Sequence, residues 1–99
     1  MIGAAHRSAW LAWLATEKRY GNNTLDAYAR DLDDFSAFAA NTTAAPSMIN
    51  RQIFRGWLAN MAARQLTRTT IARRVSSLRS FYKFCGRRQL LEVPDLSWL

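Results

Sequence analysis

The chain has few of the residues that build covalently linked or metal-bound folds. Its single cysteine, Cys85, excludes an internal disulfide framework and is typical of a reducing cytoplasm. Its single histidine, His6, and the lack of paired Cys and His spacings exclude a recognisable zinc site, and we expect no other cofactor. The 99 residues, of which 49% are hydrophobic, are therefore expected to fold as one domain (1–99) around an apolar core.

Long apolar runs are missing as well. The most apolar stretch near the N-terminus, residues 9–15, is far shorter than the roughly 20 residues that a membrane span requires. Charged residues follow this stretch, whereas in a signal peptide they precede it. We therefore expect a cytoplasmic protein with no membrane partner.

Strand-like alternation is absent, and the apolar residues recur every three or four positions instead. This spacing predicts an all-α fold, a bundle of four helices joined by short connections. The expected helices lie at about residues 4–20, 24–39, 50–64 and 67–85. The stretch 41–47, with Pro46, is expected to be a loop, and one short helical turn within 87–99 is a possible fifth helix.

Capping residues predict where three of these helices begin or end. Thr24, Asn50 and Thr67 (or Thr69) are good N-caps. Gly86 stands where a left-handed C-cap would end the last helix.

Most of the large apolar side chains are expected in the core, and Cys85 with them as an inert thiol. The expected core positions are Trp10, Leu11, Trp13, Leu14, Leu25, Tyr28, Leu32, Phe35, Ala39, Ile53, Phe54, Trp57, Leu58, Met61, Ile71, Val75, Leu78, Tyr82 and Cys85.

Acidic residues are missing from more than half of the chain. Lys and Arg number 14 against seven Asp and Glu, and no carboxylate occurs between Phe35 and Leu91. The positive residues of that stretch are Arg51, Arg55, Arg64, Arg68, Arg73, Arg74, Arg79, Lys83, Arg87 and Arg88. Such a stretch indicates a nucleic-acid partner, because Lys and Arg release condensed counterions when they bind phosphate.

A helical wheel of the last predicted helix places small hydroxyls and cations opposite its apolar stripe. These outward positions are Thr69, Arg73, Ser76, Ser77, Ser80 and Lys83. Short hydroxyl side chains allow close approach to a duplex and bind phosphate oxygens. Arg73 is expected to reach a guanine edge, where its guanidinium matches O6 and N7.

Two helix beginnings are expected to offer N–H groups to phosphate. The first comprises Asn22, Asn23 and Thr24, and the second Thr67, Arg68, Thr69 and Thr70. The predicted DNA-binding residues are Asn23, Thr24, Thr67, Arg68, Thr69, Thr70, Arg73, Arg74, Ser76, Ser77, Ser80 and Lys83.

The body of the second predicted helix is acidic and is not expected to contact DNA. Asp26, Asp33 and Asp34 fall near its outward pole. Asp31 falls at the flank of the apolar stripe, and we expect it to pair with an arginine of the last helix, Arg79.

Two stretches of the chain resemble a known family. Residues 24–35 have the pattern T-L-x-x-Y-x-x-D-L-x-x-F, and residues 71–82 have I-x-R-x-x-S-x-L-R-S-F-Y. Together they resemble the N-terminal core-binding domain of the tyrosine recombinases, within these the bacterial Xer proteins, and the XerC branch more than the XerD branch. One departure lies at Gly21 and Asn22, where relatives often have Ser and Pro.

The resemblance implies a SAM-like bundle of four or five helices that clamps one side of a recombination half-site in double-stranded DNA. It implies that the second and fourth helices lie in or along the major groove. It also implies partners: a C-terminal catalytic domain of the same protein and a paralogous recombinase in a heterotetramer that resolves chromosome dimers.

The family's catalytic residues lie in that later domain and include a tyrosine nucleophile. Tyr20, Tyr28 and Tyr82 match none of them. We therefore expect an N-terminal fragment with no catalytic residue, which cuts no DNA.

Other functions stay open at this point. The chain also suits the N-terminal domain of a phage or mobile-element integrase, or a small helical DNA-binding regulator. A protein–protein interaction bundle is the alternative of another class, although it would not require a carboxylate-free half.

Overall fold

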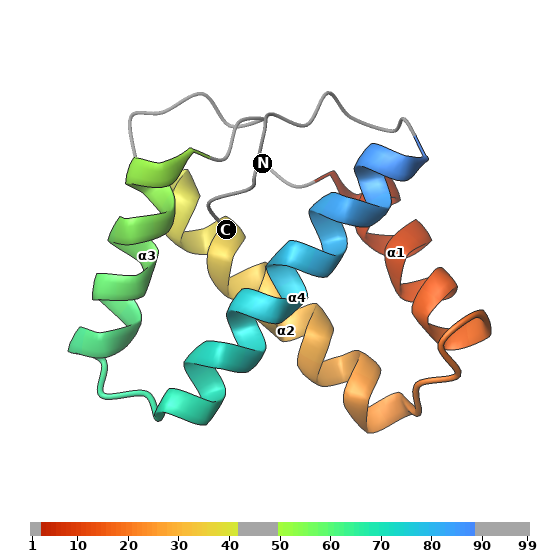
Figure 1. The fold of residues 1–99 in the computed structure, drawn as a ribbon, viewed down its shortest axis with the longest axis horizontal. Helices are drawn as coiled ribbons and strands as arrows, with labels where there is room; N and C mark the ends of the chain where they lie inside the picture. Colours follow the sequence, from red (N-terminus) through yellow and green to blue (C-terminus); the bar gives the residue numbers. More distant parts are fainter. Residues whose placement is uncertain (1–2, 42–49, 89–99) are drawn as a thin grey trace.

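The computed structural model describes residues 3–41 and 50–88, which form four α-helices (Figure 1). The helices are α1 (Ala4–Thr16), α2 (Asn22–Ala40), α3 (Arg51–Ala63) and α4 (Arg68–Arg87). This part of the chain contains no strand, so the all-α prediction is confirmed. The predicted loop around Pro46 and the predicted turn beyond residue 88 lie outside the described residues.

The two longest helices, α2 and α4, cross at the centre of the molecule, and the two shorter ones flank them on opposite sides (Figure 1). Helix α2 packs against all three others, and α1 packs against both α2 and α4. None of the helices in the described ranges is long and apolar enough to cross a bilayer.

Two of the predicted N-caps are confirmed. The Asn50 side chain accepts a hydrogen bond from the backbone N–H of Ile53 at 2.8 Å. The Thr67 hydroxyl oxygen accepts one from the N–H of Thr70 at 3.1 Å. Each cap satisfies one of the N–H groups that a helix leaves unpaired in its first turn.

The third predicted N-cap, Thr24, is wrong. Helix α2 begins two residues earlier, at Asn22, with Gly21 in extended conformation as its N-cap and no side-chain capping bond. Thr24 therefore lies inside the first turn of α2.

The predicted left-handed C-cap at Gly86 is also wrong, because α4 continues through Gly86 to Arg87. The left-handed residues of the described chain are instead Arg19 (φ 56°) and Gln65 (φ 61°). Gln65 ends α3 in a Schellman motif, in which its N–H bonds to Ala62 O and the next N–H bonds to Met61 O.

Every residue predicted for the core is buried or half-buried. Phe81 (0% exposed) and Phe84 (5% exposed) on α4 are also buried, as expected for most of the aromatic residues, although the predicted apolar stripe of this helix did not include them. Both contact α1: the ring of Phe81 lies edge-on to Trp10 at 5.8 Å, and that of Phe84 lies 5.4 Å from Trp13. Because α4 packs on α1 as well as α2, its buried side is wider than one apolar stripe.

Candidate nucleic-acid interface

A row of polar and cationic residues runs along the side of α4 that faces away from the core. We call this row the outer face of α4. Its members, spaced four, three, four, three and four residues apart, are Thr69, Arg73, Ser76, Ser80, Lys83 and Arg87. All are exposed except Ser80, which is half-buried. Arg87 was not among the predicted site residues, although continuing the same spacing by four residues would have found it.

Two of the predicted hydroxyls are already engaged inside the protein. Ser77 is 1% exposed and donates its hydroxyl to Asp31 Oδ2 at 2.7 Å, so its predicted outward position is wrong. Ser80 accepts a hydrogen bond from Trp10 Nε1 at 3.2 Å, and its own O–H is left to donate elsewhere. Ser76 is the exposed serine of the row.

Arg73 does not project freely from the outer face as predicted. Its guanidinium binds Asp31 through two hydrogen bonds, Nε to Oδ2 at 3.0 Å and Nη2 to Oδ1 at 2.7 Å. The hydrogen bond to Asp31 raises the pKa of Arg73. The side chain keeps 41% of its surface exposed, but the two guanidinium nitrogens that would bind a guanine edge are occupied by a carboxylate.

Asp31 pairs with arginines of α4 as predicted, but the expected partner, Arg79, is wrong. The partners are Arg73 and, at 3.5 Å, Arg74, whose side chain is only 17% exposed. Arg79 lies two positions beyond Ser77, which is a rotation of about 200° around the helix. Ser77 faces Asp31, so Arg79 lies on a different side of α4.

Asp34, predicted at the outward pole of α2, instead lies between α2, α3 and α4. Arg64 binds it through two hydrogen bonds of 3.0 and 2.9 Å, and Trp57 Nε1 donates to it at 2.9 Å. Burial alone would raise the pKa of Asp34, but these hydrogen bonds and the charge of Arg74, whose Nη1 lies 3.0 Å away, lower it to about 2.

These contacts form one ion-pair network, composed of Asp31, Asp34, Arg64, Arg73 and Arg74. Nε and Nη1 of Arg74 are buried with no aligned hydrogen bond, so this arginine contributes mainly through its charge. The network ties the two central helices to each other and to α3. It accounts for three of the ten positive charges in the carboxylate-free stretch.

The cations towards the end of α4 are arranged differently. Lys83 and Arg87 are exposed and form no ion pair with any residue in 3–41 or 50–88. Arg68, at the first position of the helix, is likewise exposed and unpaired within those ranges. Apart from Arg73, which is paired with Asp31, the outer face therefore presents positive charge and hydroxyl groups that no carboxylate of the described chain neutralises.

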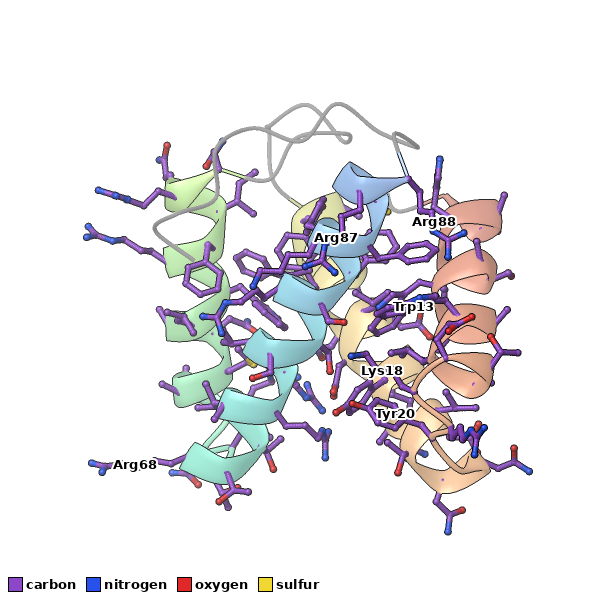
Figure 2. All side chains as sticks on the ribbon, turned by 45° about the vertical axis from the view of Figure 1, so that its right-hand side comes forward. Trp13, Lys18, Tyr20, Arg68, Arg87 and Arg88 are labelled. Carbon is purple, nitrogen blue, oxygen red and sulfur yellow. The ribbon has the colours of Figure 1, made fainter. Side chains whose placement is uncertain are left out.

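The beginnings of α2 and α4 lie along the same edge of the molecule, the lower edge in Figure 1. At α2, Asn22, Asn23 and Thr24 are all exposed. At α4, Thr70 is half-buried and its N–H donates a hydrogen bond to the Thr67 hydroxyl oxygen. The first-turn N–H groups of Arg68 and Thr69 have no acceptor within the helix. Figure 2 shows the side chain of Arg68 extending away from this corner.

Burial shifts the pKa values of three potentially nucleophilic side chains. Burial raises the pKa of Tyr82 to about 12 and that of the Cys85 thiol to about 11, so both stay protonated at neutral pH. Burial and the neighbouring Tyr20 raise the pKa of Tyr28. Within these residues, no group of three or more His, Cys, Asp or Glu side chains could hold a metal ion.

Comparison with known proteins gives a consistent result. Residues 8–89 match the family model of the phage integrase N-terminal SAM-like domain. The chain is 41% identical over 75 residues to the tyrosine recombinase XerD of Bradyrhizobium diazoefficiens, covering 76% of this chain and 24% of that protein. It is 35% identical over 95 residues to XerC of Methylobacterium nodulans, covering 91% of this chain and 30% of that protein.

A third relative, XerC of Pelotomaculum thermopropionicum, is 34% identical over 97 residues, covering 92% of this chain and 32% of that protein. The chain thus spans 24% to 32% of the length of these relatives. No solved structure matches it significantly. The all-helical fold and these similarities agree with the resemblance seen in the sequence: the chain belongs to the phage integrase family, as an N-terminal SAM-like domain similar to that of the Xer tyrosine recombinases.

Proposed function

We propose that this domain binds double-stranded DNA through the outer face of α4 and the beginnings of α2 and α4, as the part of a Xer-type recombinase that clamps a recombination half-site. The observation that carries the proposal is the outer face itself. Its six positions follow helical spacing over five turns and contain three hydroxyl residues, no carboxylate and three cations, of which Arg73 is paired with Asp31 and Lys83 and Arg87 pair with no described residue.

The chemistry of this face suits a duplex. Thr69 and Ser76 are short, so they allow the helix to approach the phosphate backbone closely and donate hydrogen bonds to it. Lys83 and Arg87 supply charge that the rest of the described chain does not neutralise. The unpaired N–H groups at the beginnings of α2 and α4 add positive partial charge at one edge.

The wider role follows from the relatives. The chain covers about a third of XerC-type proteins, and we propose that a catalytic domain beyond it encloses the other side of the half-site and performs strand cleavage. The chain described here is then a binding module that cuts no DNA by itself. We further propose that it acts on chromosomal DNA in the cytoplasm, beside a paralogous recombinase in a heterotetramer that resolves chromosome dimers.

Duplex binding by a matched pair of variants tests the proposal. Ser76→Glu places a carboxylate on the outer face, whereas Ser8→Glu makes the same change at an exposed position of α1. In fluorescence anisotropy with a labelled Xer half-site, Ser76→Glu is expected to weaken binding about tenfold, because it sets a negative charge within a few ångströms of phosphate. Ser8→Glu is expected to change affinity less than about twofold.

The salt dependence of duplex binding is a second test of the same proposal. If the domain neutralises about five phosphates, the logarithm of the binding constant should fall against the logarithm of salt concentration with a slope of about −4 to −5. A slope near zero, or equal effects of Ser76→Glu and Ser8→Glu, would contradict DNA binding by the outer face.

A further inference from the structure

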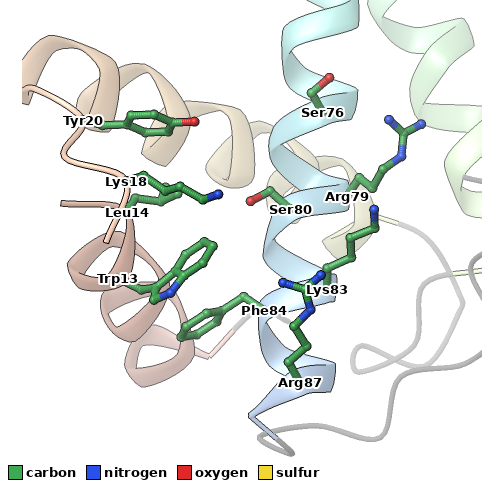
Figure 3. Close-up of a pocket in the computed structure, with 10 residues that line it drawn as sticks. All are labelled: Trp13, Leu14, Lys18, Tyr20, Ser76, Arg79, Ser80, Lys83, Phe84 and Arg87. Carbon is green, nitrogen blue, oxygen red and sulfur yellow. The ribbon is translucent and has the colours of Figure 1, made fainter. Parts of the chain in front are cut away.

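A groove of about 290 Å³ lies beside the outer face of α4 and is completed by the chain segment that follows α1 (Figure 3). Figure 3 shows the side chains of Lys18 and Tyr20 extending from this segment towards Ser80 of α4. The residues that line the groove are Trp13, Leu14, Lys18, Tyr20, Ser76, Arg79, Ser80, Lys83, Phe84 and Arg87.

The end of α1 explains how Lys18 and Tyr20 reach the groove. Helix α1 ends at Thr16, four residues before its predicted end, where the Thr16 hydroxyl donates to Ala12 O at 2.9 Å. Arg19 then takes a left-handed conformation (φ 56°), which reverses the chain. The Tyr20 N–H bonds back to Leu14 O at 3.2 Å, so the reversed segment is held against the last turn of α1.

The groove is strongly cationic. Lys18, Lys83 and Arg87 come from two different elements, and none of them forms an ion pair with a described residue. None of the described residues that line the groove carries a carboxylate. The C-terminal ends of α1 and α4 contribute only about half a negative charge each, less than the three full positive charges. The groove is therefore suited to an anion.

The aromatic side chains of the groove leave little room for a stacked base. Trp13 packs against Phe84 at 5.4 Å, and the Lys18 ammonium lies 5.4 Å from its ring centroid. Tyr20 is packed edge to face with Tyr28 at 5.5 Å. What the groove offers is cations together with the hydroxyls of Ser76 and Ser80, and this combination favours a phosphate over an unstacked nucleobase.

We propose that this groove holds a phosphate of the DNA backbone, and that Lys18 extends the DNA contact from α4 to the turn after α1. This inference rests on the proposed function and adds a binding residue that the sequence reasoning did not select. Lys18 is held over Trp13 by a cation–π contact, so its ammonium is positioned before DNA arrives.

The test is the salt dependence of duplex binding by the full chain carrying Lys18→Met, which removes the charge and keeps an apolar stem over Trp13. We expect the slope of the logarithm of the binding constant against the logarithm of salt concentration to become less negative by about 0.9, which is the contribution of one phosphate contact. Lys18→Arg should restore the original slope. The matched control is Arg55→Met on α3, which removes an exposed cation that does not line the groove and should leave the slope unchanged.

Lys83→Met separates a failure of this inference from a failure of the proposed function. If Lys83→Met reduces the slope and Lys18→Met does not, the groove proposal is wrong and DNA binding by α4 stands. If neither variant changes the slope, the proposed function is wrong as well. Circular dichroism melting of each variant confirms that the compared proteins are folded.

NMR titrations of the wild-type chain distinguish duplex DNA from a small anion as the source of the phosphate. We expect the backbone amides of Lys18 and Tyr20 to shift with duplex DNA and to show no saturable shift with inorganic phosphate at the same ionic strength. A saturable response to inorganic phosphate with no response to duplex would overturn the proposal.

Discussion

The two sides of α4 use the same kind of side chain for different purposes. On the inner side Arg74, together with Arg73 at the edge of the outer face, is neutralised by Asp31 and Asp34 of α2, and the resulting network ties the central helices together. On the outer side, Lys83 and Arg87 have no carboxylate within the described chain. The positive residues behind the net charge of +7 therefore do not all have the same role. Part of the positive charge stabilises the fold through ion pairs, and another part is left for a partner.

The largest expected effect comes from the inner side. Arg73→Ala leaves the carboxylate of Asp31, whose side chain is 0% exposed, without the two hydrogen bonds that the guanidinium donates to it. We expect the free energy of unfolding to fall by about 3 kcal/mol, at the lower end of the range for breaking a buried pair, because Arg74 and Ser77 remain nearby. Urea denaturation measures the loss.

Arg87→Ala on the outer face is the matched control for Arg73→Ala. It should change the free energy of unfolding by less than about 0.5 kcal/mol. Equal losses in the two variants would contradict the division of α4 into a structural and a binding side.

Acid titration is expected to produce the next largest effect. The folded-state pKa of Asp34, about 2, is below its ordinary value of 3.8, so its stabilising contribution is present above pH 3.8 and is lost as the pH falls towards 2. The difference corresponds to about 2 kcal/mol. Urea denaturation between pH 5 and pH 2 should show a shallower pH dependence for Asp34→Asn than for the wild type.

Asp33→Asn serves as a control for the loss of a carboxylate, because the Asp33 side chain is 57% exposed although it pairs with Arg7. At neutral pH it should lower the free energy of unfolding by less than Asp34→Asn does, because exposed ion pairs contribute little to stability. If Asp34→Asn keeps the full pH dependence of the wild type, the network does not hold Asp34 ionised as described.

Ser77→Ala is expected to have a smaller effect. It removes the buried hydroxyl that donates to Asp31 at 2.7 Å, and a hydrogen bond to a charged group contributes about 1.5 kcal/mol or more. Thermal or urea unfolding should show this loss, whereas duplex affinity of the folded protein should stay within about twofold. If the variant keeps its stability but loses DNA binding, Ser77 contacts DNA and its assignment to the interior is wrong.

The smallest effect on stability is expected at Lys83. Lys83→Ala should change the free energy of unfolding by less than about 0.5 kcal/mol, because the side chain is exposed and forms no ion pair with a described residue. The same variant should make the salt slope of duplex binding less negative by about 0.9. Loss of stability without a change in slope would assign Lys83 to the fold instead of the interface.

Much of the fold could be predicted from the sequence, because the signals are local. The spacing of Leu32, Phe35 and Ala39 is a helical stripe, and Asn50 and Thr67 cap helices with side chains that act within three residues. The errors arose where tertiary contacts decide. Phe81 and Phe84 are buried because α1 packs beside α4, and no pattern within α4 alone shows that neighbour.

The candidate site was predictable in outline and less so in detail. Helical spacing placed Thr69, Ser76 and Lys83 correctly on the outward side of α4. Arg73 and Ser77 were assigned to the same side because a wheel cannot tell which edge of a polar sector meets another helix. Lys18 was missed because it reaches α4 only through the left-handed turn at Arg19, which residue spacing does not reveal.

The most direct test of the central claim is an NMR titration of the isotope-labelled chain with a Xer half-site duplex. DNA binding by the outer face predicts that the largest amide shifts fall in α4, around Thr69, Ser76, Lys83 and Arg87, and at the beginning of α2, with small shifts in α3. Shifts concentrated in α3, with α4 unchanged at saturating DNA, would contradict the account.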